Sequence, residues 1–209
     1  MRYLLLDHLK FFSIIIMISY HYFFIDSFLF GAKMWDFNSY LLELIRFLFI
    51  GISGFALALS YSKLKTESYF RYRLFKLLFA SVLISVVSWF LFPDYFIYFG
   101  IIHLIFAANL LVYLFKFFKV YLFLVTFILI IFPEILHVNF IRLSTLDYFP
   151  FFPYLFYFLV PFLSFKFTKK FLTLKKPNYI SYIVKPSLII YLLHPIVIFI
   201  YLHLYYKLI

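Results

Sequence analysis

Seven stretches of mostly apolar residues divide this 209-residue chain, and each is long enough to cross a membrane. They lie at about 4–25, 41–62, 74–92, 97–115, 118–133, 148–165 and 187–206. A helix needs about 17–25 such residues to span the hydrocarbon core of a bilayer, because it rises about 1.5 Å per residue. The pattern therefore predicts an all-α integral membrane protein, built as a single bundle of about seven transmembrane helices.

The composition supports a membrane setting and excludes some chemistry. Hydrophobic residues make up 67% of the chain, more than a soluble domain of this length needs to fill one core. The segments between the spans are short, so we expect one domain over residues 1–209. The chain has no cysteine, which excludes disulfides, thiolate nucleophiles and cysteine-ligated metals. No metal site is predicted.

The positions of the Lys and Arg residues predict the orientation. If the N-terminus is cytoplasmic, 15 of the 19 Lys and Arg residues fall on the cytoplasmic side. Cytoplasmic loops of membrane proteins carry an excess of these residues, so we expect a cytoplasmic N-terminus and an extracytoplasmic C-terminus. The cations lie in short loops beside the membrane, where they would meet anionic lipid headgroups or a phosphorylated cytosolic ligand. The lipid bilayer is therefore an expected partner, and nucleic acid is not.

The first span carries ionisable side chains on one face. Lys10 and His21 are separated by an apolar run, and on a helix they would lie about 16 Å apart. Asp7 shares their stripe. Such groups usually face a bundle interior or a wet cavity, and an imidazole can exchange a proton at neutral pH. The structural alternatives are an interfacial anchor for Lys10 and a packing histidine for His21.

The second span combines an ion pair with small residues. Glu43 and Arg46 lie three residues apart at its outer start, where we expect them to bond to each other or to a neighbouring helix. Further along, Gly51 and Gly54 begin a stripe of small residues at helical spacing. Such stripes let another helix approach closely, so we expect close packing there.

Polar residues also mark three later spans. His103 and Asn109 could line an outward-facing cavity, and His103 could equally be an interfacial histidine. Asp147 precedes Pro150 in the manner of a cap on the sixth span. His194 lies near mid-membrane before a proline that frees backbone carbonyls, so a carbonyl-bonded structural role and a site role both stay open.

Six blocks of the sequence together resemble a known family. The first contains Asp7, Lys10 and His21, and it is similar to an Asp-x-x-Arg-Gly opening followed by a histidine, with Lys10 in the place of the arginine. The others lie, in the same order as in the family, at 47–54, 71–76, 98–103, 146–153 and 187–195. The family is that of the heparan-α-glucosaminide N-acetyltransferase catalytic domain, which is grouped with transmembrane acyltransferases.

The resemblance implies a reaction and roles for particular residues. The chain would move an acetyl or other acyl group from cytosolic acyl-CoA to a sugar or glycolipid acceptor on the extracytoplasmic side. His21 would be the acyl-transfer histidine, while His103 and Asp147 would shape the acceptor side. The expected co-substrate is acetyl-CoA or another acyl-CoA, and the expected location is the plasma membrane of a prokaryote. A homo-oligomer stays open as an assembly state.

The chemistry of acyl transfer is compatible with this assignment. Transfer from a thioester needs a group that deprotonates the acceptor or one that first accepts the acyl group, and imidazole can do either. The inner cations Arg71, Arg73 and Lys76 could hold the phosphates of coenzyme A together with Lys10. The remaining residues with an expected supporting or acceptor-side role are Asp7, Glu43, Arg46, Asn109 and His194.

Three other functions fit parts of the pattern. A proton-coupled transporter or flippase could use His21, His103 and His194 as a relay. The spacing of His21 and Asp26 matches the His-x-x-x-x-Asp motif of glycerolipid acyltransferases. However, the Phe-Pro-Glu segment at 132–134 lacks the Gly-Thr-Arg that should follow it in that family. A noncatalytic membrane scaffold is the third alternative.

Overall fold

The structure is a computed structural model that describes residues 2–33, 39–62, 67–115, 121, 124, 128, 145–149, 151–172 and 174–208. It forms two compact units. The terminal unit comprises residues 1–49 and 170–209, and the central unit comprises residues 50–169. Helix α2 (Ser39–Ser62) begins in the terminal unit and ends in the central unit. The two units are described separately below.

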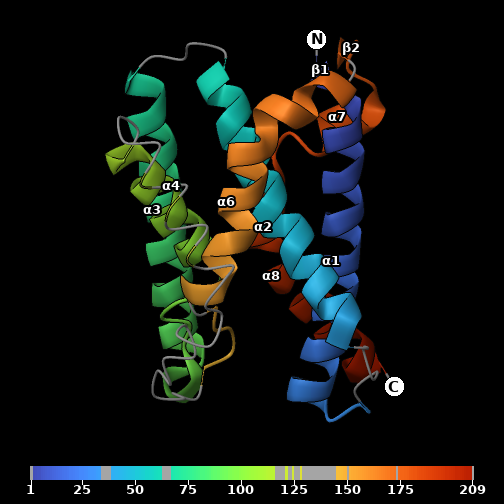
Figure 1. Ribbon diagram of the computed structural model, residues 1–209. Coiled ribbons are helices and arrows are strands. Elements are labelled where there is room, and N and C mark those ends of the chain that lie inside the picture. The colour runs from blue at the N-terminus through green and yellow to red at the C-terminus, as the bar shows by residue number, and fades with distance from the viewer. Residues whose placement is uncertain are drawn as a thin grey trace. The chain divides into compact units, whose positions relative to one another are not determined.

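The terminal unit is built from the two ends of the chain (Figure 1). Its elements are β1 (Arg2–Tyr3), α1 (Leu4–Phe30), β2 (Leu174–Lys175), α7 (Tyr179–Ile183) and α8 (Ser187–Leu208), with the short 3-10 helix η3 (Lys169–Phe171) at its boundary. The strands β1 and β2 pair antiparallel, with the backbone of Arg2 opposite that of Lys175. This two-stranded ribbon and α7 lie at the start of α1, and the C-terminus lies at the other end of the unit (Figure 1).

Helices α1 and α8 pack against each other and run in the same direction. The ring of His21 contacts that of His194, and nearer the ends of both helices the hydroxyl of Tyr206 donates a 2.9 Å hydrogen bond to Asp26. Contact partners therefore advance together along both helices. First and last helices that run in parallel need an odd number of membrane crossings in all, which is compatible with seven predicted spans and with termini on opposite sides.

Local sequence explains where the long helices stop. Helix α1 ends at Gly31, whose φ of 71° lies in the left-handed region that favours glycine, and its N–H donates to the carbonyl of Ser27. Helix α3 (Glu67–Leu91) stops just before Pro93, because the residue preceding a proline disfavours helical geometry.

The central unit contains the later half of α2 with α3, the short 3-10 helix η1 (Pro93–Tyr95), α4 (Ile101–Leu114) and α6 (Phe151–Thr168). Helices α3 and α4 are antiparallel, since Arg73 bonds to Asn109 while Ser85 lies against His103. Seven of the 14 residues of α4 are buried, whereas α3 exposes many large apolar side chains. Helix α4 therefore forms the core of this unit, and the outer face of α3 suits contact with lipid.

The prediction of a helical fold with long apolar helices is confirmed. Within the described residues, four helices are long and apolar enough to cross a membrane, namely Leu4–Phe30, Leu42–Tyr61, Glu67–Leu91 and Ser187–Leu208. Shorter apolar helices lie at Ile101–Leu114 and Tyr154–Thr168. The predicted span 118–133 lies almost entirely outside the described residues, so the total of seven spans stays a prediction, as does the single domain. The third helix starts at Glu67 rather than at 74, because its first two turns contain Arg71 and Arg73, which a hydropathy window excludes.

Candidate functional site

The site begins with two histidines that the fold brings together from opposite ends of the chain. His21 lies on α1 and His194 on α8, and their ring centroids are 4.7 Å apart with the planes at 75°. His21 is half-buried and His194 is buried, with 6% of its surface exposed. Because α1 is continuous, Lys10 and His21 do share one helix, as predicted from the apolar run between them.

Hydrogen bonds to the backbone fix the tautomer of both rings. Nδ1 of His21 lies 2.9 Å from the carbonyl oxygen of Met17, and Nδ1 of His194 lies 2.7 Å from that of Tyr191. Only a ring nitrogen that carries hydrogen can bond to a carbonyl oxygen, so each Nδ1 is the donor. In each neutral ring Nε2 therefore carries a lone pair, which can take a proton or attack a carbonyl carbon.

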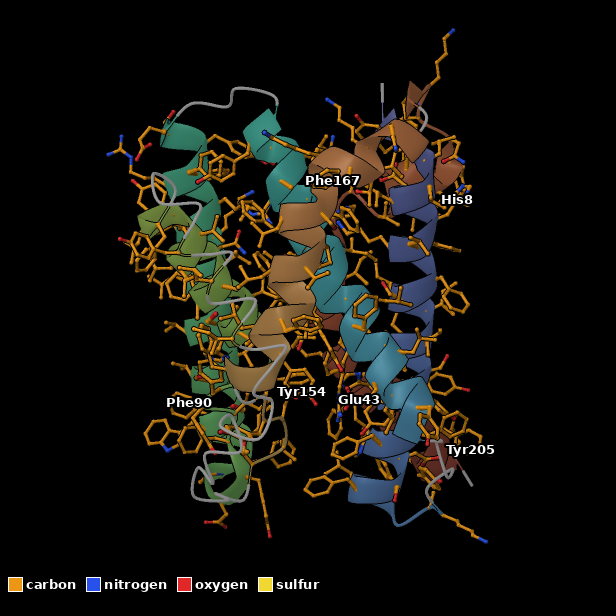
Figure 2. All side chains as sticks on the ribbon, viewed as in Figure 1. His8, Glu43, Phe90, Tyr154, Phe167 and Tyr205 are labelled. Carbon is orange, nitrogen blue, oxygen red and sulfur yellow. The ribbon has the colours of Figure 1, made fainter. Side chains whose placement is uncertain are left out.

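Asp7 anchors the start of α1 to α7. Its carboxylate is buried and accepts a 2.6 Å hydrogen bond from the hydroxyl of Ser181. Asn178 precedes α7 and accepts the backbone N–H of Ser181 at 3.0 Å, which caps that helix. Figure 2 shows His8 at this end of the terminal unit and Tyr205 at the opposite end. Asp7 thus holds secondary structure together, and Lys10 is half-buried on the next turn of α1.

The partners of Asp7 were missed in the sequence analysis. The pattern of Asn178 followed three residues later by Ser181, directly after Pro177, is a helix-start signal that could have identified α7. Nothing in the sequence links that short helix to Asp7, since 174 residues separate Ser181 from it.

Replacing Ser181 with alanine is expected to destabilise the terminal unit. The change removes a donor to a buried carboxylate, which costs about 1–3 kcal/mol in free energy of unfolding. Thermal unfolding in detergent measures the loss. The matched control is Ser19→Ala, because Ser19 is exposed and donates to the carbonyl of Ile15 on its own helix. Equal melting temperatures for both variants would contradict the anchoring role of Asp7.

Glu43 and Arg46 form the predicted ion pair. Their side chains are 2.5 Å apart at the start of α2, and both are partly exposed. The prediction that they bond to each other is confirmed. An ion pair within one turn of a helix favours a structural role at this end of α2.

The three inner cations of α3 have different surroundings. Arg71 and Lys76 are exposed, and the ammonium of Lys76 lies 4.4 Å from the centroid of the Tyr72 ring. Arg73 turns into the central unit, where its Nε donates to Asn109 at 2.9 Å.

Further polar groups hold Arg73 in that position. Its terminal nitrogen donates to the carbonyl of Ser53 at 3.3 Å, and Tyr69 adds a side-chain hydrogen bond. The structure thus joins Arg73, which the sequence analysis counted among the inner cations, to Asn109, which it expected to line an outward-facing cavity.

His103 and Asp147 meet at the start of α4. Nδ1 of His103 accepts the N–H of Gly100 at 3.1 Å, so its Nε2 carries the hydrogen and donates to Ser85 at 3.0 Å. The Ser85 hydroxyl donates in turn to the carbonyl of Ile97. The serine is therefore not activated by the histidine, and the network favours a structural role for His103.

Asp147 caps α4 in the same place. Its carboxylate accepts the N–H of Ile101 at 3.3 Å. The sequence analysis had placed it as a cap on the following span, and the structure shows that it accepts a backbone N–H of the preceding one. The close fit explains why residue 100 is glycine, since a Cβ there would lie 2.5 Å from the Asp147 carboxylate.

Among the described residues, no group of three or more His, Asp or Glu side chains could hold a metal ion.

The family of the chain is shown by its sequence. The family profile for the heparan-alpha-glucosaminide N-acetyltransferase catalytic domain matches residues 2–196, a range that includes both histidines of the pair. No curated protein and no solved structure matches the chain. The match over nearly the whole sequence confirms the resemblance read from the six blocks, and the chain belongs to the heparan-α-glucosaminide N-acetyltransferase catalytic-domain family.

Proposed function

We propose that this integral membrane protein is a transmembrane acyltransferase. It moves an acetyl or other acyl group from acyl-CoA on the cytosolic side to a sugar or glycolipid on the extracytoplasmic side. The membrane is the plasma membrane of a prokaryote, and the acceptor belongs to the cell envelope. Membership of an N-acetyltransferase family supports the reaction class, and the long apolar helices support the setting.

The observation that carries the proposal is the contact between His21 and His194. Both rings donate Nδ1–H to a backbone carbonyl, so both have an Nε2 lone pair, and the rings are in contact inside a helical seam. A pair of imidazoles held between two helices suits acyl transfer, because neutral imidazole can be held in a membrane at lower cost than a charged group.

In the direct form of the mechanism, Nε2 of His21 takes the proton from the acceptor hydroxyl or amine. The acceptor oxygen or nitrogen then forms a bond to the thioester carbonyl carbon, and the carbon–sulfur bond breaks. The imidazolium returns its proton to the departing thiolate, so CoA leaves as a thiol. In the covalent form, Nε2 of His21 forms a bond to the thioester carbonyl carbon while the carbon–sulfur bond breaks and CoA leaves as a thiolate. The acceptor then takes the acyl group as the bond to Nε2 breaks, and the proton that the acceptor loses balances the charge of the thiolate.

The inner cations would hold the donor. Lys10 near the start of α1, and Arg71 and Lys76 near the start of α3, would offer positive charge to the phosphates of CoA, since the charge pattern assigns both helix ends to the cytoplasm. Arg73 reaches deeper, and its guanidinium is already oriented by Asn109. Planar guanidinium groups donate in a fixed geometry, which suits a phosphate or a thioester carbonyl.

The acceptor side would be shaped at helix ends that the charge pattern assigns to the extracytoplasmic side. His103 and Asp147 hold the start of α4, which positions the loop before it. Glu43 and Arg46 form an ion pair at the start of α2, in the terminal unit. We expect these residues to support the site by holding helix ends rather than by contacting the reacting atoms.

The experiment that tests the function uses the purified protein in proteoliposomes. Incubation with radiolabelled acetyl-CoA and an envelope extract is expected to label a sugar-containing product, which mass spectrometry would identify. Absence of label in any envelope component would overturn the proposal. Ion or lipid flux across the same vesicles without acyl-CoA would favour the transporter alternative instead.

A further inference from the structure

The transfer steps given above leave one basic nitrogen of the histidine pair without a role, namely Nε2 of His194. The side chain is buried, and this nitrogen has no hydrogen-bond partner among the residues that the structure describes. A buried polar atom without a partner costs free energy, so its presence calls for an explanation. A nitrogen that receives a proton during the reaction supplies one.

A proline fixes the orientation of this ring. Pro195 has no N–H, so the carbonyl of Tyr191, four residues earlier on α8, lacks its usual helical donor. Nδ1 of His194 takes that place at 2.7 Å, and it also lies 3.3 Å from the carbonyl oxygen of Ile190. The hydrogen of the neutral ring is therefore held on Nδ1 by the backbone, and the lone pair stays on Nε2.

The covalent form of the transfer needs a second base. Once Nε2 of His21 carries the acyl group, its Nδ1 hydrogen is still bonded to the carbonyl of Met17, so that ring has no lone pair left. The acceptor hydroxyl or amine must nevertheless lose a proton when it attacks the acyl carbon. Another group has to take this proton, in a setting where each added charge is costly.

His194 meets this need by its position and its chemistry. Its ring contacts that of His21, with the centroids 4.7 Å apart, so an acceptor that attacks the acyl group on His21 arrives beside His194. A neutral imidazole can take a proton at neutral pH. As the acyl group leaves, the acylated ring loses its positive charge while His194 gains one. The pair therefore carries one charge throughout the second step.

We propose that His194 is the base of the second step, so that the two histidines divide the reaction between them. Nε2 of His21 bonds to the acyl carbon while the carbon–sulfur bond breaks. The acceptor oxygen or nitrogen then bonds to that carbon, the bond to Nε2 of His21 breaks, and the acceptor proton moves to Nε2 of His194. Release of this proton balances the thiolate formed in the first step. The inference rests on the proposed acyltransferase function and specifies its covalent form.

The test separates the two steps in the full-length protein in lipid nanodiscs. His194→Asn keeps a side-chain N–H that can donate to the carbonyl of Tyr191, but it has no basic nitrogen. With labelled acetyl-CoA alone, the variant is expected to release a burst of CoA and to retain the label. When an envelope extract is added, we expect the label to leave the variant about 10²-fold or more slowly than it leaves wild-type protein.

The position of the label can be assigned directly. The chain has no cysteine, so a thioester on the protein is excluded, and removal of the label by neutral hydroxylamine indicates an acyl-imidazole. His21→Ala is expected to retain no label. The burst also shows that His194→Asn is folded and binds the donor, so a slow second step in that variant cannot come from misfolding.

The matched control is His203→Asn, the same substitution on the same helix. His203 is exposed, and its ring stacks on that of Phe199. This variant is expected to pass its label to the extract at the wild-type rate. A second variant, His194→Ala, removes the whole ring. Added imidazole is expected to speed its second step, because it supplies the missing base in the space that the ring occupied.

The outcomes separate the role of His194 from the function on which it rests. A wild-type second step in His194→Asn, or equal slowing of both steps, would overturn the assignment and leave the acyltransferase intact. Product formation without label on wild-type or variant protein would do the same, because transfer would then be direct. Failure of wild-type protein to label any envelope component would overturn the proposed function as well.

Discussion

Replacing His21 with alanine is expected to lower acyl transfer by about 10²–10⁴-fold, which is the usual contribution of a general base or acid. The acceptor would lose the group that takes its proton, or the acyl group would lose its first recipient. Affinity for acyl-CoA is expected to stay near the wild-type value, because the proposed donor contacts come from Lys10 and the cations of α3. Single-turnover transfer of labelled acetyl-CoA and equilibrium binding of a non-hydrolysable analogue measure the two effects separately.

The matched control for this experiment is His203→Ala. His203 lies on α8 like His194, but it is exposed and its ring stacks on Phe199 rather than on another histidine. Its removal is expected to leave transfer unchanged. Full turnover in His21→Ala would remove His21 from the mechanism. A parallel loss of acyl-CoA binding would mean that it shapes the donor site instead of the reaction.

The first helix and its histidine could be predicted from the sequence because both depend on local information. The apolar run between Lys10 and His21 is long enough for a span, and helical periodicity then places the two residues on one face. The contact between His21 and His194 could not be predicted in this way. It joins residues at opposite ends of the chain, and no local pattern states which distant helix will pack against α1.

The cations of α3 also have a contact partner that the local sequence could not predict. Arg71, Arg73 and Lys76 read as one basic cluster, but residues two apart on a helix point to nearly opposite sides. Arg73 therefore turns toward Asn109 while Arg71 stays exposed. The periodicity could have separated the two arginines, whereas the identity of the partner could not have been derived.

Asp147 illustrates a helix contact that the local sequence does not predict. Its position before a proline indicated a capping carboxylate, and it does accept a backbone N–H at a helix start. The helix is α4, whose first residue is 46 positions earlier. A cap is chosen by which amide groups lie nearest in space, and the fold of the central unit decides that.

The second large effect is expected from Gly54→Ala, which tests the close approach of α2 and α6 in the central unit. A Cβ at residue 54 would collide with the carbonyl oxygen of Phe158 and would lie 3.2 Å from its carbonyl carbon. These are backbone atoms, so no side-chain rotation can relieve the contact and the two helices must separate. We expect a loss of about 1–3 kcal/mol or more in free energy of unfolding, as for other overpacked interiors.

Gly51→Ala is the matched control, one helical turn away on the same face. Its Cβ would lie 3.3 Å from Cγ of Pro161 and 3.4 Å from the carbonyl oxygen of Tyr157, which small shifts can accommodate. Alanine also favours a helix over glycine by about 0.8–1.0 kcal/mol, so this variant is expected to melt near the wild-type temperature. Thermal unfolding in detergent compares the two. Because both variants gain the same helical preference, any difference between them reports the helix contact alone, and equal melting temperatures would mean that α2 and α6 do not meet at Gly54.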